Sequence, residues 1–265
     1  MEYLFDCWEK IQDELSEKFV FLLLDYDGTL TTIVETPGQA LIPKETKTIL
    51  DRIVANSHCG VAIISGRSLS DLKNMIGLSE VIYAGNHGLE IEGPKIRFES
   101  RISPDSKSII RHIADEIKIR LAKIKGVLIE DKGLSISAHY RLVDTKDFQE
   151  FLSVFHEITE PYLDRKQIRI ISGKKVYDVR PPVVWDKGKV VLWLLARQQF
   201  MTGEQGVFPV YIGDDVTDED AFRALKNEGL TIYIGEAGNS CAQYYLKSTD
   251  EVSVFLRRLL ESKKG

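Results

Sequence analysis

Residues 21–30 read FLLLDYDGTL, an apolar run that ends in two aspartates, a glycine and a threonine. An apolar run of strand length bounded by polar residues is typical of a strand covered on both faces, as in a parallel sheet. Because side chains alternate along a strand, Asp25 and Asp27 are expected to leave it on the same side. Two neighbouring carboxylates repel one another, so the fold must supply or recruit a positive group. Taken alone, an Asp-x-Asp pair is more often a strand-end turn than a catalytic site.

Three other segments share this pattern of an apolar run that ends in polar or glycine residues. They are GVAIISGR (60–67), FPVYIGDD (208–215) and LTIYIGE (230–236). Helical patterns follow the first run and the runs at 60–67 and 208–215. Alternation of strand and helix predicts right-handed crossover units and a parallel sheet, whose ligands bind beyond the carboxyl ends of the strands.

The pattern changes between residues 101 and 181, where a helical segment followed by two alternating segments occurs twice. This predicts an antiparallel α+β module. The module is inserted rather than appended, because the run at 208–215 resumes the first pattern. We therefore predict an α/β protein in which residues 1–100 and 182–265 form a Rossmann-like parallel-sheet core domain and residues 101–181 form an inserted domain.

Composition excludes several classes of protein. With 35 Lys and Arg against 40 Asp and Glu, the net charge of −5 argues against nucleic acid or an anionic membrane as the main partner. Cys7, Cys59 and Cys241 are widely spaced, which gives no disulfide or zinc pattern and fits a reducing compartment. The acidic N-terminal segment does not resemble a signal peptide, and residues 4–15 have the apolar spacing of an amphipathic helix. We expect a cytoplasmic monomer.

More carboxylates follow the third apolar run, since GDDVTDED places Asp214, Asp215 and Asp218 at an equivalent strand end. Carboxylates gathered without an equal number of cations usually hold a hard divalent ion, and an open set of oxygen ligands suits Mg²⁺ bridging to a phosphate. The sequence thus predicts a Mg²⁺ site made from Asp25, Asp27, Asp214, Asp215 and Asp218.

A site for a phosphoryl group also needs hydrogen-bond donors and a fixed cation. ISGRSLSD offers the Ser65 hydroxyl and backbone amides at a helix start, and WDKGK offers Lys187 at the head of another helix. Each signal is weak alone, because a serine before glycine is commonly a turn and a loop lysine is commonly solvated. Together these motifs form a strong signal, because each of them lies at a strand end or a helix start.

The order DYDGT, SGR, DKG, GDDVTDE resembles the four motifs of the haloacid dehalogenase (HAD) superfamily of aspartate-based phosphatases. Within that superfamily, GNHGLEI (85–91), LSISAHYR (134–141), KKVYDVRP (174–181) and the GDDxTDE form resemble trehalose-6-phosphate phosphatases. The resemblance implies a HAD core domain, an inserted α+β cap domain of the C2 type, Mg²⁺ as cofactor, a sugar phosphate as substrate and a trehalose-6-phosphate synthase in the same pathway.

The resemblance also implies roles for individual residues. Asp25 would be the nucleophile that attacks phosphorus. Asp27 would protonate the leaving sugar oxygen and later deprotonate water, with its backbone carbonyl on the metal. Asp214 would be a side-chain metal ligand, and Ser65 and Lys187 would hold the transferring phosphoryl group.

Ten further residues are implied to shape the phosphate loop or to bind the sugar: Gly28, Thr29, Gly66, Arg67, Asn86, His87, Glu90, Arg141, Lys175 and Asp178. Members of the family usually carry Glu where Asp178 stands, so two substrate classes stay open. The first is trehalose 6-phosphate, and the second is another sugar phosphate, such as glucosylglycerol phosphate or mannosyl-phosphoglycerate, on which the protein would act as a phosphatase or a mutase. A non-catalytic binding module is a third alternative. We expect His139 to be a structural strand histidine with a backbone partner.

Overall fold

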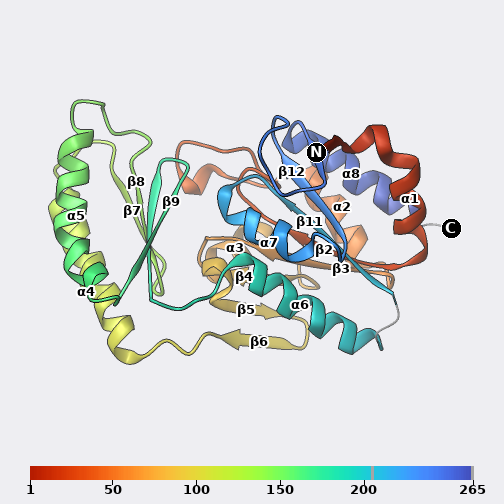
Figure 1. Ribbon diagram of the computed structural model, residues 1–265, viewed down its shortest axis with the longest axis horizontal. Helices are drawn as coiled ribbons and strands as arrows, with labels where there is room; N and C mark the ends of the chain where they lie inside the picture. Colours follow the sequence, from red (N-terminus) through yellow and green to blue (C-terminus); the bar gives the residue numbers. More distant parts are fainter. Residues whose placement is uncertain (204–205, 264–265) are drawn as a thin grey trace. The chain divides into compact units, whose positions relative to one another are not determined.

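The computed structural model describes residues 1–203 and 206–263. The chain divides into two compact units (Figure 1). The core unit consists of Met1–Phe98 and Trp185–Gly265, and the inserted unit is Glu99–Val184.

The core unit carries its elements in this order: β1 (Glu2–Tyr3), α1 (Trp8–Glu17), β2 (Phe19–Leu24), α2 (Lys44–Val54), β3 (Cys59–Ile64), α3 (Leu69–Ile76), β4 (Ile82–Gly85), β5 (Glu90–Gly93), β6 (Ile96–Glu99), α6 (Lys187–Thr202), β11 (Val207–Gly213), α7 (Glu219–Leu225), β12 (Leu230–Ile234), β13 (Tyr244–Leu246) and α8 (Thr249–Ser262). Its sheet has the strand order β1-β13-β12-β11-β2-β3-β4-β5-β6. Pairing is parallel from β1 through β4 and antiparallel between β4 and β5.

Helices cover both faces of the core sheet, and the alternation of side chains decides which residue faces which helix. Val20, Leu22 and Leu24 of β2 pack in the cluster that includes residues of α1, α2, α3 and α8. Phe21 and Leu23 pack in the opposite cluster with residues of α6 and α7. Burial on both faces explains why β2 is an uninterrupted apolar run. The two-residue period continues beyond β2, so Asp25 is directed toward the face that α6 covers.

The inserted unit is built from two successive copies of a helix followed by a hairpin. Its elements are α4 (Pro104–Leu121), β7 (Leu128–Asp131), β8 (Ile136–His139), α5 (Phe148–Asp164), β9 (Arg169–Gly173) and β10 (Val176–Arg180). The strands form an antiparallel sheet in the order β7-β8-β10-β9. Ile136, Ala138 and Val179 point to the helices and share a core with Ile113 of α4 and Phe155 of α5.

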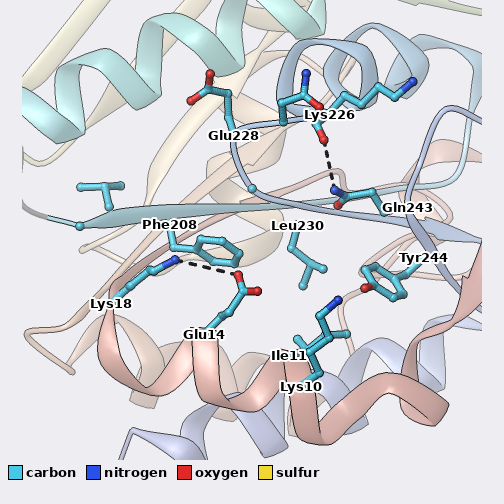
Figure 2. Close-up of a pocket in the computed structure, with 14 residues that line it drawn as sticks. Lys10, Ile11, Glu14, Lys18, Phe208, Lys226, Glu228, Leu230, Gln243 and Tyr244 are labelled. Atoms are coloured by element: carbon cyan, nitrogen blue, oxygen red, sulfur yellow. Dashed lines mark hydrogen bonds and ion pairs between the residues drawn. The ribbon is translucent and has the colours of Figure 1, made fainter.

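The amino edge of the core sheet carries a groove with a volume of about 480 Å³. It is lined by residues of α1, by the start of β11 and by the segment that leads into β12. Figure 2 shows Glu14 paired with Lys18 at 3.9 Å, and the side-chain amide of Gln243 donating to the backbone oxygen of Lys226 at 3.1 Å. This groove lies at the end of β11 opposite to Asp214. Within the described residues, no helix has the length and apolar content that crossing a membrane requires.

Candidate active site

Two neighbouring parallel strands bring the acidic loops together. β2 and β11 pair in register, with Leu24 opposite Ile212, and their carboxyl ends lie at the same edge of the core sheet. The backbone amide of Asp25 donates to the oxygen of Ile212 at 2.9 Å, which extends the pairing into the loop. The aspartates of DYDG and of GDDVTDE therefore meet, as the sequence pattern predicts.

Lys187 lies between two of the carboxylates. It is the first residue of α6, whose start is capped by the Asp186 side chain accepting from the Lys189 amide at 2.9 Å. The ammonium of Lys187 donates to Asp25 Oδ1 at 2.7 Å and to Asp218 Oδ1 at 2.6 Å. All three members of this ion triad are buried. The fold thus supplies a fixed cation beside Asp25.

Asp218 organises this part of the site. Its Oδ1 accepts from Lys187 and from the Tyr211 hydroxyl at 2.5 Å. Its Oδ2 accepts from the backbone amides of Asp214 at 3.0 Å and Asp215 at 2.9 Å. Four donors thus surround one fully buried carboxylate, which fixes both the lysine and the GDD loop. Tyr211 was not predicted as a site residue, because a tyrosine within an apolar strand is normally interpreted as part of the hydrophobic core.

The charges of the site shift the pKa values of its members. Burial raises the pKa of Asp25, Lys187 opposes that rise, and the neighbouring Asp218 and Asp214 add to it. For Lys187, burial alone would lower the pKa, but Asp218 and Asp25 outweigh it and the pKa lies above its ordinary value. The ammonium therefore stays charged, whereas Asp25 stays ionised more readily when another cation is near.

The acidic cluster fits a divalent cation. Asp25, Asp214 and Asp218 each offer an oxygen, and these oxygens lie within 4.8 Å of one another. With Lys187 their ionised forms carry a net charge of minus two, which a hard divalent cation neutralises. Because Asp218 already accepts four hydrogen bonds, Asp25 and Asp214 are the better suited direct ligands. Asp215 lies outside this group, and its Oδ1 accepts from the Val216 amide at 2.7 Å.

Gly28 allows the two acidic loops to approach one another. Its φ is +86°, and a Cβ added there would lie 2.1 Å from Asp214 Oδ2. The next residue, Thr29, is buried, and its hydroxyl oxygen has no hydrogen-bond partner in the described structure. A buried hydroxyl without a partner is costly unless water or a ligand bonds to it.

We expect Gly28→Ala to lower the free energy of unfolding by about 2–4 kcal/mol, because it adds backbone strain to a clash with Asp214. The measurement is urea unfolding followed by circular dichroism. Gly38→Ala is the matched control, because an added Cβ meets nothing within 4 Å there. Equal stability of the two variants would contradict the tight approach.

The loop after β3 contributes the second part of the predicted site. Ser65 is buried, and its hydroxyl accepts from the Arg67 amide at 3.1 Å. Its backbone oxygen accepts from the His87 amide at 2.8 Å. Gly66 lies against the imidazole of His87, since an added Cβ would be 2.4 Å from Nε2. The segments SGR and GNHG are therefore packed into one structure.

Backbone strain marks the GNHG segment. Asn86 has φ +50° and His87 has φ +55°, in a region that residues other than glycine rarely occupy. The side-chain amide of Asn86 donates to Glu90 Oε2 at 2.6 Å. Strained backbone of this kind clusters at functional sites, and the predicted roles of these three residues in substrate binding stay predictions.

Arg67 was predicted to contact the substrate, and in the structure its guanidinium pairs with Asp27. Its Nε donates to Asp27 Oδ2 at 2.8 Å, and its Nη2 donates to Asp27 Oδ1 at 2.6 Å. Asp27 therefore faces a guanidinium, while Asp25 faces an ammonium. The two aspartates of DYDG have different partners, although they are one residue apart.

The remaining predicted residues belong to the inserted unit and fall at two places. Lys175 lies in the turn between β9 and β10, and Arg141, which follows β8, donates to the oxygen of Lys174 in that turn at 2.8 Å. Lys175 has φ +67°, and its ammonium lies 5.9 Å from the centre of the Tyr140 ring. Asp178 lies within β10, away from this turn.

Asp178 belongs to a polar cluster that was not predicted from the sequence. It accepts from Ser137 and, at 2.9 Å, from Arg180. Lys132 donates to Ser137 at 2.6 Å and is almost fully buried. These side chains lie on the face of the sheet opposite to its helices, as the register of β8 and β10 requires.

His139 lies beside this cluster. The prediction that its ring has a backbone partner was wrong. Its Nε2 lies 3.1 Å from Glu130 Oε2, so its ring partner is a side chain. His139 and Glu130 lie on the neighbouring strands β8 and β7, and the sequence pattern does not reveal which cross-strand residues come within reach.

Comparison with known proteins identifies the family. A family model described as trehalose-phosphatase matches residues 23–250. The chain belongs to the trehalose-phosphatase family. Among its relatives, the probable trehalose-phosphate phosphatase H of Arabidopsis thaliana is 35% identical over 98% of this chain and 77% of its own length. The chain is therefore a phosphoric monoester hydrolase, as predicted.

Solved structures confirm the predicted HAD fold class of the chain. The C-terminal domain of Candida albicans trehalose-6-phosphate phosphatase is similar with a TM-score of 0.81, 26% identity and coverage of 96% of each chain. A haloacid dehalogenase-like hydrolase from Bacteroides thetaiotaomicron is similar with a TM-score of 0.63 and 17% identity, covering 91% of this chain and 100% of that one. The second similarity concerns the fold alone.

Proposed function

We propose that the protein hydrolyses trehalose 6-phosphate to trehalose and phosphate, with Mg²⁺ as cofactor and a phosphoaspartyl intermediate on Asp25. The observation that carries this proposal is the buried arrangement of Asp25, Lys187, Asp214 and Asp218. In this arrangement the Asp25 carboxylate lies beside a fixed cation and two further carboxylates at the carboxyl edge of a parallel sheet, which supports its proposed role as nucleophile. The family assignment supports the substrate.

In the first step, Asp25 attacks phosphorus and the bond from phosphorus to the sugar oxygen breaks. Asp27 gives its proton to that oxygen, so the sugar leaves as an alcohol. Ser65 and Lys187 hold the phosphoryl oxygens, and Lys187 offsets the negative charge that gathers beside Asp25. The hydrogen bond between Lys187 and Asp25 keeps the attacking carboxylate in place.

In the second step, water attacks the phosphorus of the phosphoaspartyl group. The carboxylate of Asp27 takes a proton from that water, and the bond between phosphorus and Asp25 breaks. Both aspartates return to their starting states, and the net reaction consumes one water. A bound Mg²⁺, held by Asp25, Asp214 and the backbone oxygen of Asp27, would neutralise phosphoryl charge in both steps.

For the inserted unit, we propose the role of a cap domain that supplies residues for the sugar. Arg141, Lys175 and Asp178 are polar, and the first two lie together at one turn. Asp178 is shorter than the glutamate usual in the family, which keeps a different sugar phosphate as the alternative substrate. The cytoplasmic location, the monomeric state and a pathway shared with a trehalose-6-phosphate synthase stay predictions from the sequence.

The test of this function is phosphate release from a panel of esters by the purified protein. The panel contains trehalose 6-phosphate, glucose 6-phosphate, glucosylglycerol phosphate and mannosyl-phosphoglycerate, each with Mg²⁺ and with EDTA. We expect trehalose 6-phosphate to give the highest kcat/KM and EDTA to remove most of the activity. A preference for another ester would retain the mechanism and replace the substrate, whereas equal activity in EDTA would contradict the role of Mg²⁺.

A further inference from the structure

The two side chains of the ion pair between Arg67 and Asp27 differ greatly in their exposure to solvent. The Arg67 side chain is only 7% exposed, whereas the Asp27 side chain is 42% exposed. An ion pair with a solvated partner adds little to stability, about 0–1 kcal/mol, while burial of a guanidinium has a cost. The stability of the fold alone therefore does not explain why a buried arginine is paired with a solvent-exposed aspartate.

Arg67 is held in place from several directions. Its guanidinium lies over the ring of Tyr26, 5.4 Å from the ring centre. Tyr26 is itself fully buried and donates its hydroxyl to the oxygen of Ala40 at 2.7 Å. The Arg67 backbone donates to the Ser65 hydroxyl at 3.1 Å and accepts from the Asn86 amide at 2.7 Å. A fixed fork of two donors thus faces a carboxylate that a ligand can reach.

We infer that Arg67 is a positioning residue that fixes the carboxylate of Asp27 for proton exchange with the leaving oxygen and with water. Two parallel hydrogen bonds define both the direction and the plane of a carboxylate, which one bond does not. Since Ser65 is in the same loop, the group that holds phosphate and the group that orients the acid are connected by two residues. This inference rests on the proposed function and assigns Arg67 to Asp27 rather than to the sugar.

Esters with different leaving groups separate this role from others. A sugar leaves as a poorly stabilised alkoxide unless it receives a proton, whereas p-nitrophenolate leaves readily without one. Proton transfer from a placed acid contributes about 10²- to 10⁴-fold to rate, so in the first step only the sugar ester depends strongly on Asp27, whereas the second step is the same for both esters. Loss of Arg67 should therefore act selectively on the sugar ester.

The experiment compares the single-turnover rate of leaving-group release, which reports the first step alone, and KM, for p-nitrophenyl phosphate and for the sugar phosphate that the wild-type protein hydrolyses fastest. We expect Arg67→Gln to reduce this rate for the sugar ester about 30-fold more than for the aryl ester, with little change in KM. Arg67→Lys should give an intermediate ratio, because an ammonium keeps the charge without the two-pronged geometry. Arg52→Gln, which removes an exposed arginine of α2, is the matched control.

A double-mutant cycle identifies the residue through which Arg67 acts. Asp27→Asn alone should show the same selective loss for the sugar ester. If Arg67 works through Asp27, adding Arg67→Gln to Asp27→Asn should leave the ratio of the two single-turnover rates unchanged. Additive effects on that ratio would overturn the inference.

Three other results would also overturn it. Equal losses of the single-turnover rate on both esters would indicate a structural role, and a raised KM for the sugar ester without a selective change in that rate would indicate direct binding of substrate. An increase in that rate on removal of Arg67 would show that the pair restrains Asp27. Failure of the proposed function is recognised separately, because the wild-type protein would then release no phosphate from any sugar ester.

Discussion

Asp25→Asn is expected to lower the rate of phosphate release from trehalose 6-phosphate by a factor of about 10³ or more, because an amide cannot form the phosphoaspartyl group. The fold should persist, since asparagine has nearly the same shape and its oxygen can still accept from Lys187. The substitution removes one charge from a site where burial, together with Asp218 and Asp214, raises the pKa of Asp25. The measurement is single-turnover and steady-state phosphate release with Mg²⁺ present.

Asp51→Asn is the control for Asp25→Asn, because Asp51 is an exposed aspartate of α2. It should retain wild-type kcat. Trapping of the intermediate adds a second measurement: wild-type protein quenched in acid during turnover should carry phosphate, and the Asp25→Asn protein should carry none. Phosphate found on the Asp25→Asn protein would show that another residue is the nucleophile.

The strands that position this site could be predicted because burial leaves a simple pattern. β2, β3, β11 and β12 each coincide with an apolar run that ends in polar or glycine residues. Burial on both sides of a parallel sheet leaves no polar face, so the run is continuous and easily recognised. The N-terminal helix was also predicted, although its regular part begins at Trp8 and Leu4 lies in a short 3₁₀ segment.

Features that depend on contacts across the sheet could not be predicted in the same way. Tyr211 and Asp218 are seven residues apart, and only the turn after β11 brings the hydroxyl to the carboxylate. Arg67 and Asp27 are forty residues apart and meet because β2 and β3 are neighbours. Sequence patterns reveal which face of a strand is polar, but not which partner lies opposite.

The same limit applies to the inserted unit. The alternation in LSISAHYR indicates one polar face, and the structure has this face on β8. Alternation does not reveal that Lys132, Ser137 and Arg180 are buried beside Asp178, since polar residues on strands are mostly exposed. Asp178 was found only through its place in a family motif.

Lys187→Met is expected to have the largest effect on stability. It removes the only cation that the ion triad contains and leaves Asp25 and Asp218 facing one another in a buried environment. Removing one partner from a buried ion pair costs about 3–5 kcal/mol, since the remaining charge has lost its compensation. Phosphate release should also fall below detection, because the phosphoryl oxygens lose their fixed cation. Urea unfolding and the phosphate assay measure the two effects.

Lys189→Met provides a matched control for Lys187→Met on the same helix, because its side chain is 43% exposed and its ion pair with Asp186 is at the surface. We expect it to change the free energy of unfolding by less than about 1 kcal/mol. Mg²⁺ should stabilise the Lys187→Met protein more than the wild type, because it binds folded carboxylates that have lost their ammonium. The two variants could instead prove equally stable, with or without Mg²⁺. That result would show that Asp25 and Asp218 are not both ionised in the folded chain. The acidic cluster would then carry less negative charge than the three ionised carboxylates and Lys187 imply, and it would attract a divalent cation less strongly.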